Sequence, residues 1–475
     1  MRLIKNRLGG GSSNKDKIEL QVFREPNKKR KIILITVLFS MLALSCMYLY
    51  KTYAVFTEEK HFNVINGTVQ DPGDIYFAYY VDNTITREMP KKGTGYTLDI
   101  EKSNCTNGVT VGWNQDKWTA LVNYENYNAT DYTRTKCNLY FKQVTYCDLH
   151  SETMACQITK LATTETTSLA IDDYGNTRYI GADPNNYVSV DGDIWRIIGV
   201  MKDIDDGTGN KSDRVKLIRA DSIGDYSWDT SESSVNEGYG VNEWSQADLM
   251  KLLNPGYESV TVGGSLYWNN GTGTCYNNRA NVAASCNFTS MGIREKLKTL
   301  ISDVVWNTGS QGTNNYQSTG GGLVKHFYTY ERGNNTGKIC SSGNYCNDFV
   351  TRTTTWTGKV GLMYPSDYGY ATSGESITNR ATCLNTYLNN WGSSSVSDCK
   401  NGDWLFNSSS SQWTLSSGAY SSVADFVFFV HSSGIINFDY AYDTNAVRPV
   451  VYLLSSVKIV SGDGSSSNPY VLSGS

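Results

Sequence analysis

One uncharged stretch near the N-terminus constrains this chain more than any other feature. Residues 32–50 are nineteen consecutive residues without a charge. A helix rises about 1.5 Å per residue, so this stretch can cross a bilayer core about 30 Å thick. The basic block at 28–31 precedes it, and positive flanks stay on the cytoplasmic side. We therefore expect a basic cytoplasmic tail at 1–31, a transmembrane helix at 32–50 and an extracellular bulk, in a single-pass plasma-membrane protein.

Two other uses of this stretch stay open. A cleaved secretory signal peptide is one, although no small-x-small cleavage site follows the apolar run cleanly. A lipid anchor on Cys46 is the other, but the preceding Ala-Leu-Ser is a poor lipobox. The sequence leaves undecided whether the anchor is cleaved.

Charge is distributed unevenly along the chain and bears on the class of partner. Residues 1–31 carry a net charge of +7, which leaves −11 on the remainder of a chain whose total is −4. Nucleic-acid phosphates are bound by basic surfaces. The acidic body therefore argues against a nucleic-acid partner.

The cysteines support an extracellular location independently. Cys46 lies in the apolar stretch, and the other ten form five pairs of sequential neighbours. An even number of cysteines in a chain facing an oxidising exterior predicts a disulfide framework. Zinc sites use CxxC-like spacings with histidines, and these gaps are irregular in a chain with four His. We expect no zinc and five disulfides: Cys105–Cys137, Cys147–Cys156, Cys275–Cys286, Cys340–Cys346 and Cys383–Cys399.

The segment 61–143 shows the alternation of apolar and polar residues that is typical of β-strands. The alternation is clear from Ile75 to Val81 and recurs at 118–122 and 137–141. With a disulfide between Cys105 and Cys137, it predicts a β-sandwich stapled as immunoglobulin-like modules are. Residues 144–186 are expected to be a connector.

A larger domain is expected at 187–455. It opens with two β-rich runs joined by Asp191-Gly192, a strong hairpin signal. Helical patterns follow from Ser245 to Pro255 and over 290–306. A final hairpin and strand occupy 424–454, and 456–475 are expected to form a C-terminal strand and tail. The fold class is therefore mainly β, with an α+β C-terminal domain.

Three motifs in this domain resemble a known group. The runs 194–200 (IWRIIGV), 360–370 (VGLMYPSDYGY) and 447–453 (VRPVVYL) are together similar to an uncharacterised bacterial surface-protein family. Its C-terminal domain looks related to the C-type-lectin-like fold, which formylglycine-generating enzymes share. The resemblance implies that 194–200 pairs with 447–453 and that long loops form the recognition face. It also implies a structural Arg448, partly buried and held by an acidic or carbonyl partner.

Signatures of catalysis and metal binding are weak. The chain lacks GxSxG, HExxH, P-loop and strand-following GxGxxG motifs. Formylglycine-generating relatives use a reactive cysteine pair, for which Cys340 and Cys346 are the nearest candidates, but an inert disulfide is the commoner state outside the cell. The acidic loop 203–213 fails the EF-hand spacing. No catalytic residue, metal or cofactor is predicted, and calcium is left open.

Aromatic composition favours recognition. The chain has 33 Tyr and 11 Trp, and tyrosine combines a large rigid contact area with a polar tip. If Tyr440 and Tyr442 share a strand face, their spacing places them side by side, and Trp413 would complete a stacking platform. Each of these residues could equally be an ordinary strand or loop residue. The predicted binding residues are Trp413, Asn437, Asp439, Tyr440, Tyr442 and Asp443, followed by Tyr368 and Tyr370.

These observations predict a membrane-anchored extracellular binding or adhesion protein. Its partners would be the membrane and an extracellular protein or glycan, while the ligand's identity and the oligomeric state are left open. Two alternatives remain: an extracellular enzyme of formylglycine-generating or glycan-modifying type, and a structural envelope protein.

Overall fold

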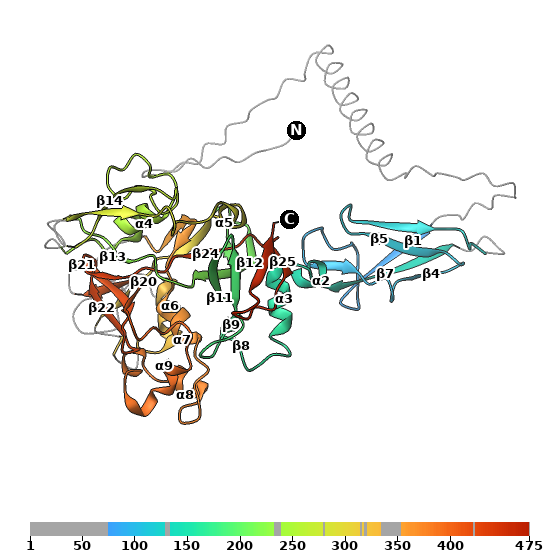
Figure 1. Ribbon diagram of the computed structural model, residues 1–475. Helices are drawn as coiled ribbons and strands as arrows, with labels where there is room; N and C mark the ends of the chain where they lie inside the picture. Colours follow the sequence, from blue (N-terminus) through green and yellow to red (C-terminus); the bar gives the residue numbers. More distant parts are fainter. Residues whose placement is uncertain are drawn as a thin grey trace, which may run out of the picture. The chain divides into compact units, whose positions relative to one another are not determined.

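The computed structural model describes residues 75–128, 134–231, 239–278, 281–313, 316–317, 321–333, 353–420 and 423–474 (Figure 1). The chain is mainly β, as expected. The predicted membrane segment 32–50 and the pair Cys340 and Cys346 lie outside the described residues. Within the described ranges, no helix is both long and apolar enough to cross a membrane.

The N-terminal module is built from short strands. One sheet has the order β2-β1-β7-β3, with β4 also paired to β7, and a separate hairpin joins β5 to β6. Trp113 on the hairpin packs edge-on against Phe141 of the sheet, with ring centroids 5.6 Å apart. The strands are β1 (Ile75–Val81), β2 (Thr84–Thr86), β3 (Tyr96–Leu98), β4 (Asn104–Cys105), β5 (Thr110–Asn114), β6 (Thr119–Asn123) and β7 (Thr135–Gln143).

The disulfide of this module differs from the expected staple. Cys105 and Cys137 are bonded to each other, as predicted. They are also directly opposed partners on β4 and β7, two neighbouring strands of one sheet. An immunoglobulin-like disulfide joins two facing sheets. The expectation of such an inter-sheet staple is therefore wrong, because here the bond closes a pairing within one sheet.

The main domain is organised around a large sheet. Among the described residues, nine strands form it in the order β19-β24-β12-β11-β10-β26-β25, with β9 also paired to β11 and β8 to β9. Two strands come from the expected connector and two from the expected tail. The strands are β8 (Leu169–Ile171), β9 (Thr177–Tyr179), β10 (Tyr187–Val190), β11 (Asp193–Asp205), β12 (Lys211–Arg219), β19 (Val360–Gly361), β24 (Val450–Tyr452), β25 (Lys458–Ser461) and β26 (Tyr470–Ser473).

The opening hairpin of this sheet follows the predicted chemistry. Asp191 and Gly192 connect β10 to β11 with φ angles of 50° and 87°. Two successive positive φ values suit a type I′ turn, whose twist matches the flanking strands. The expected pairing of 194–200 with 447–453 is wrong, because β12 lies between β11 and β24. Leu217 of β12 takes the place opposite Val451.

A second sheet carries the late strands. Its order is β13-β23-β20-β21-β22, with β17 paired to β20, so β22 forms one edge. The predicted final hairpin is present as β21 and β22. The strands are β13 (Asp225–Ser227), β17 (Gln311–Gly312), β20 (Gln412–Tyr420), β21 (Val423–Val430), β22 (Ile436–Tyr440) and β23 (Thr444–Ala446). Two further pairs, β14 (Thr272–Tyr276) with β15 (Ala283–Asn287) and β16 (Val304–Asn307) with β18 (Thr355–Gly358), form separate two-stranded sheets.

Short helices cover these sheets. α3 packs on β11 and β12, while α6 and α7 pack on each other and on the second sheet. The expected helix over 290–306 is present only as α5, which ends at Leu300. The β-branched pair at 304–305 belongs to strand β16 instead. The helices are α2 (Tyr146–Leu149), α3 (Met154–Leu161), α4 (Asp248–Leu253), α5 (Glu295–Leu300), α6 (Val324–Glu331), α7 (Pro365–Tyr370), α8 (Arg380–Leu384) and α9 (Asp398–Asn401), with 3-10 turns η1 (Trp244–Gln246), η2 (Leu388–Asn390) and η3 (Ser394–Val396).

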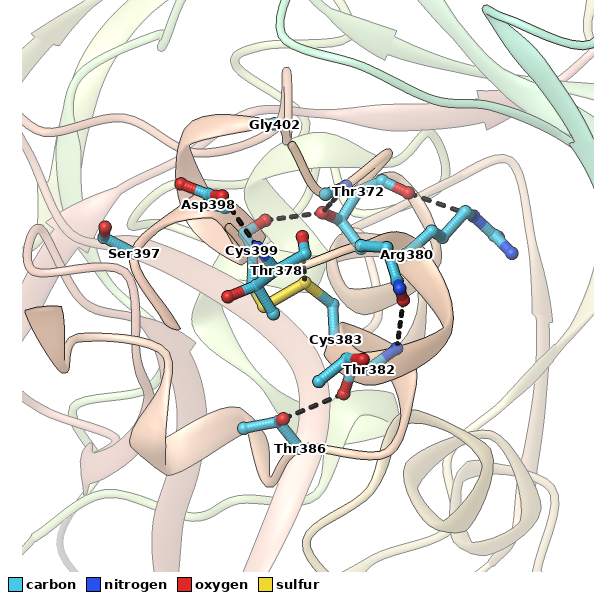
Figure 2. The surroundings of a disulfide bond; sticks show 12 residues. Thr372, Thr378, Arg380, Thr382, Cys383, Thr386, Ser397, Asp398, Cys399 and Gly402 are labelled. Atoms are coloured by element: carbon cyan, nitrogen blue, oxygen red, sulfur yellow. Dashed lines mark hydrogen bonds between the residues drawn. A yellow bond between two sulfur atoms is a disulfide. The ribbon is translucent and has the colours of Figure 1, made fainter. Parts of the chain in front are cut away.

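Disulfides fasten the loops as predicted. Of the five expected pairs, the four that fall within the described residues are bonded: Cys105–Cys137, Cys147–Cys156, Cys275–Cys286 and Cys383–Cys399. Figure 2 shows the last of these, which joins α8 to α9. Beside it, Asp398 accepts hydrogen bonds from the backbone N–H groups of Ile377 and Thr378 at 2.7 and 2.9 Å.

Candidate functional site

Three of the predicted binding residues are part of the core. Trp413 is 1 % exposed, and its indole N–H donates to the carbonyl of Tyr226. Tyr368 and Tyr370 lie in α7, whose residues are all buried. The expectation that these three side chains offer an exposed recognition surface is therefore wrong, because packing of α7 and of strand β20 encloses them.

Tyr440 and Tyr442 do lie side by side. Their ring centroids are 5.5 Å apart and the planes differ by 11°. A third ring, Tyr239, approaches Tyr440 to 4.4 Å and Tyr442 to 5.6 Å in near-parallel orientation. All three side chains are partly exposed. We call Tyr239, Tyr440 and Tyr442 the tyrosine cluster.

Strand β22 positions the cluster. Tyr440, its last residue, lies opposite Phe426 of β21, and the two rings stack at 4.6 Å. Phe426 is 9 % exposed and contacts Phe438, which follows the same face of β22. The tyrosine cluster is thus the exposed end of an aromatic row that begins in the core. The N–H of Tyr442 donates to the carbonyl of Tyr239 at 3.3 Å, which ties the two segments together.

Strand alternation separates two of the predicted polar residues, Asn437 and Asp439, from these rings. Successive side chains of a strand point to opposite faces, so Asn437 and Asp439 face away from Phe438 and Tyr440. Asn437 accepts a hydrogen bond from the Tyr316 hydroxyl at 3.2 Å. The structure therefore places Asn437 and Asp439 on the opposite face of β22 from Tyr440.

Asp439 and Asp443 form a carboxyl pair beside the turn that follows β22. Burial, followed by the hydrogen bond and negative charge of Asp439, raises the pKa of Asp443 to about 7. Two adjacent carboxylates repel each other, so Asp443 keeps its proton to a higher pH than an isolated aspartic acid does. We call Asp439 and Asp443 the aspartate pair.

Sequence reasoning missed two features of the surface. Tyr239 lies two hundred residues from Tyr440, and no local pattern marks it. The second is a polar recess of about 300 Å³ beside the β11–β12 hairpin. Asp203 in its wall has a φ of 52°, an uncommon conformation for a non-glycine residue. The recess is lined by Asn176, Met201, Lys202, Asp203, Ile204, Asp205, Lys211, Val305, Asn307, Tyr328 and Arg332.

Arg448 is buried, as expected. Its Nε donates to the carbonyl of Arg219 at 2.9 Å and its Nη1 to the Gln412 side chain at 3.2 Å. Burial, reinforced by the charge of Arg196, lowers the pKa of Arg448 to about 10. The side chain holds β12, β20 and the segment before β24 together.

In the part of the chain that the structure describes, no cluster of three or more His, Cys, Asp or Glu side chains is suited to a metal ion. The chain matches no protein-family model, no curated protein and no solved structure.

Proposed function

We propose that this chain is a membrane-anchored extracellular binding protein that recognises a protein or glycan ligand at the tyrosine cluster. In this proposal the basic tail is cytoplasmic, the N-terminal module is a spacer and the main domain is a C-type-lectin-like recognition domain. The observation that carries the proposal is the convergence of Tyr239, Tyr440 and Tyr442 from two distant segments.

The form of the cluster supports recognition. Isolated exposed aromatic residues are common on protein surfaces, but contiguous ones tend to mark interaction sites. The three phenol rings restrain one another, so little side-chain entropy is lost when a ligand contacts them. Their hydroxyl groups add hydrogen-bonding capacity to an apolar contact area.

Two features support the extracellular location. Four predicted cysteine pairs are bonded in the described residues, and structural disulfides persist mainly in oxidising compartments. The apolar stretch 32–50 supplies an anchor in the sequence. Both agree with a chain whose bulk is exported.

The test is a screen of the purified chain against glycan arrays and extracellular proteins, followed by substitutions in the cluster. Tyr442→Ala is the informative variant, because Tyr440 also packs on Phe426. We expect binding to weaken by about 1–3 kcal/mol, as for an interface hot spot, with the melting temperature nearly unchanged. The readout is affinity by titration calorimetry or surface plasmon resonance.

Tyr174→Ala is the matched control. Tyr174 is 42 % exposed and stacks on Tyr328 at 3.8 Å, so it is also a surface tyrosine on an aromatic neighbour. Its hydroxyl contacts Thr329 of α6 and not β22. Equal loss of affinity in both variants, or none in Tyr442→Ala, would remove the cluster from the binding site.

A further inference from the structure

A group of charged side chains lies inside the main domain, where water is excluded. Lys216 of β12 and Asp367 of α7 have side chains that are 1 % and 2 % exposed, and the Lys216 Nζ lies 2.5 Å from Asp367 Oδ2. Arg178 of β9 is 1 % exposed, with its Nη1 2.7 Å from the other oxygen, Oδ1. Glu331 at the end of α6 is also buried. We call these four residues the buried charge cluster.

Aromatic rings enclose the lysine. Its Nζ lies 4.1 Å from the ring centre of Tyr364, 5.5 Å from that of Tyr452 and 5.7 Å from that of Trp306. An ion pair in such a setting retains a large desolvation cost, because two charges have been taken out of water. A neutral link between the same two groups would not bear that cost.

The remaining charges do not need this ion pair. Arg178 also contacts Asp172, with Nε 2.9 Å from Oδ2. Arg332 lies 3.5 Å from Glu331. If Lys216 and Asp367 became neutral together, each remaining charge would keep a partner of opposite sign.

We propose that Lys216 and Asp367 condense to form an isopeptide bond. The lone pair of Nζ attacks the Asp367 Cγ, the Cγ–Nζ bond forms, and a Cγ–O bond breaks. The departing oxygen leaves as water with two of the three ammonium protons, and the third stays on the amide nitrogen. An ammonium and a carboxylate thus become one neutral amide and one water, with no oxidant or other co-reactant.

The neighbouring residues suit the steps of this condensation. Burial lowers the pKa of Lys216 to about 8, which brings the nucleophilic neutral amine within reach near neutral pH. Burial raises the pKa of Glu331 to about 7, so this acid can pass protons in either direction. Glu331 accepts hydrogen bonds from the N–H and hydroxyl of Ser366, next to Asp367. The Arg178 guanidinium would stabilise the oxyanion of the tetrahedral intermediate.

The bond would join strands and helices that are far apart in the chain. Lys216 and Asp367 are separated by 151 positions. A link between β12 of the large sheet and α7 would therefore close a loop that contains much of the main domain. Such a loop limits the conformations of the unfolded chain as a disulfide does, but reductants do not break the bond that closes it.

Mass spectrometry of the purified full chain, reduced and alkylated, tests the proposal. The mass is expected to be lower than the sequence mass by one water. Trypsin then cannot cut after Lys216, so the map should contain a branched peptide that joins residues 215–219 to residues 360–380. Lys216→Arg and Glu331→Gln are expected to lose this peptide, and either variant suffices if the other fails to fold.

Peptide mapping also separates the proposal from other losses of water. Succinimide formation at Asp191-Gly192 would lower the mass equally but leaves the tryptic site after Lys216 intact. Normal cleavage at Lys216 in the wild-type chain, whatever the intact mass, would overturn the proposal. Equal amounts of branched peptide in wild type and Glu331→Gln would remove Glu331 from the reaction.

Discussion

The main domain holds two groups of carboxylates with opposite behaviour. In the buried charge cluster, before any condensation, Asp367 is fully enclosed, yet the nearby Lys216 and Arg178 outweigh burial and lower its pKa. In the aspartate pair, burial raises the pKa of Asp443 to about 7, and the hydrogen bond and negative charge of Asp439 add to the rise. Opposite charges thus override burial at Asp367, whereas a like charge reinforces it at Asp443.

The comparison also separates two roles. Paired charges in a dry interior hold elements in one arrangement, and removing one partner leaves the other uncompensated. Like charges at a surface weaken the fold slightly and remain sensitive to pH. Substitutions of single carboxylates test this difference.

Asp367→Ala should have the largest effect. It leaves Lys216 buried without a carboxylate, removes one of the two carboxylates that contact Arg178 and prevents the proposed isopeptide bond. We expect the free energy of unfolding to fall by about 3–5 kcal/mol, measured by chemical denaturation. Asp213→Ala is the control, because Asp213 pairs with Lys202 where the side chains are 16 % and 37 % exposed. Asp213→Ala should lower the free energy of unfolding by less than about 1 kcal/mol. Similar decreases in both variants would contradict the comparison.

Asp398→Ala should have an intermediate effect. Asp398 is buried near Cys383–Cys399, and its carboxylate accepts from two backbone N–H groups (Figure 2). Its removal leaves these donors unsatisfied, at a cost of about 1.5–3 kcal/mol in the same denaturation assay. A decrease in the free energy of unfolding as large as that of Asp367→Ala would show that ionic partners do not increase the stabilisation from a buried carboxylate.

Asp443→Asn should have the smallest effect, and its sign depends on pH. The folded chain holds the Asp443 proton more tightly than the unfolded chain, so this group stabilises the fold below pH 3.8 and that contribution is lost as the pH rises through about 7. As the pH rises from 3.8 to about 7, the free energy of unfolding should therefore fall less in Asp443→Asn than in wild type. Melting temperatures at several pH values measure the difference between the two curves.

The difference between the wild-type and Asp443→Asn curves cancels the contribution of other groups that titrate in the same pH range. The pKa of Glu331 is also raised to about 7, but Glu331 is present in both proteins. Parallel curves for wild type and Asp443→Asn would mean that the pKa of Asp443 is not raised in the folded chain.

Local patterns determined several parts of the fold. Asp191-Gly192 predicted the hairpin of β10 and β11, because positive φ values are needed there and few residues adopt them readily. Closely spaced cysteines predicted their own partners, since short loops bring them together at little entropic cost. These features depend on neighbouring residues, so the sequence alone was enough.

Burial of tyrosines was decided by tertiary packing. Tyr368 and Tyr370 have polar hydroxyls and are among the predicted binding residues, yet every residue of α7 is buried. The Tyr368 hydroxyl donates to the carbonyl of Gly434, which satisfies it inside the core. Composition could not distinguish these tyrosines from Tyr442, because exposure depends on which elements pack around each ring.

Local patterns in the sequence were enough to predict a mainly β chain and the disulfide pairs within the described residues. Packing of distant segments was needed to bring Tyr239 to Tyr440, to bury Trp413 and to place Lys216 beside Asp367. These two groups of features differ in sequence separation. Contacts within a hairpin follow from backbone geometry, whereas contacts across more than a hundred residues arise only when whole sheets and helices pack together.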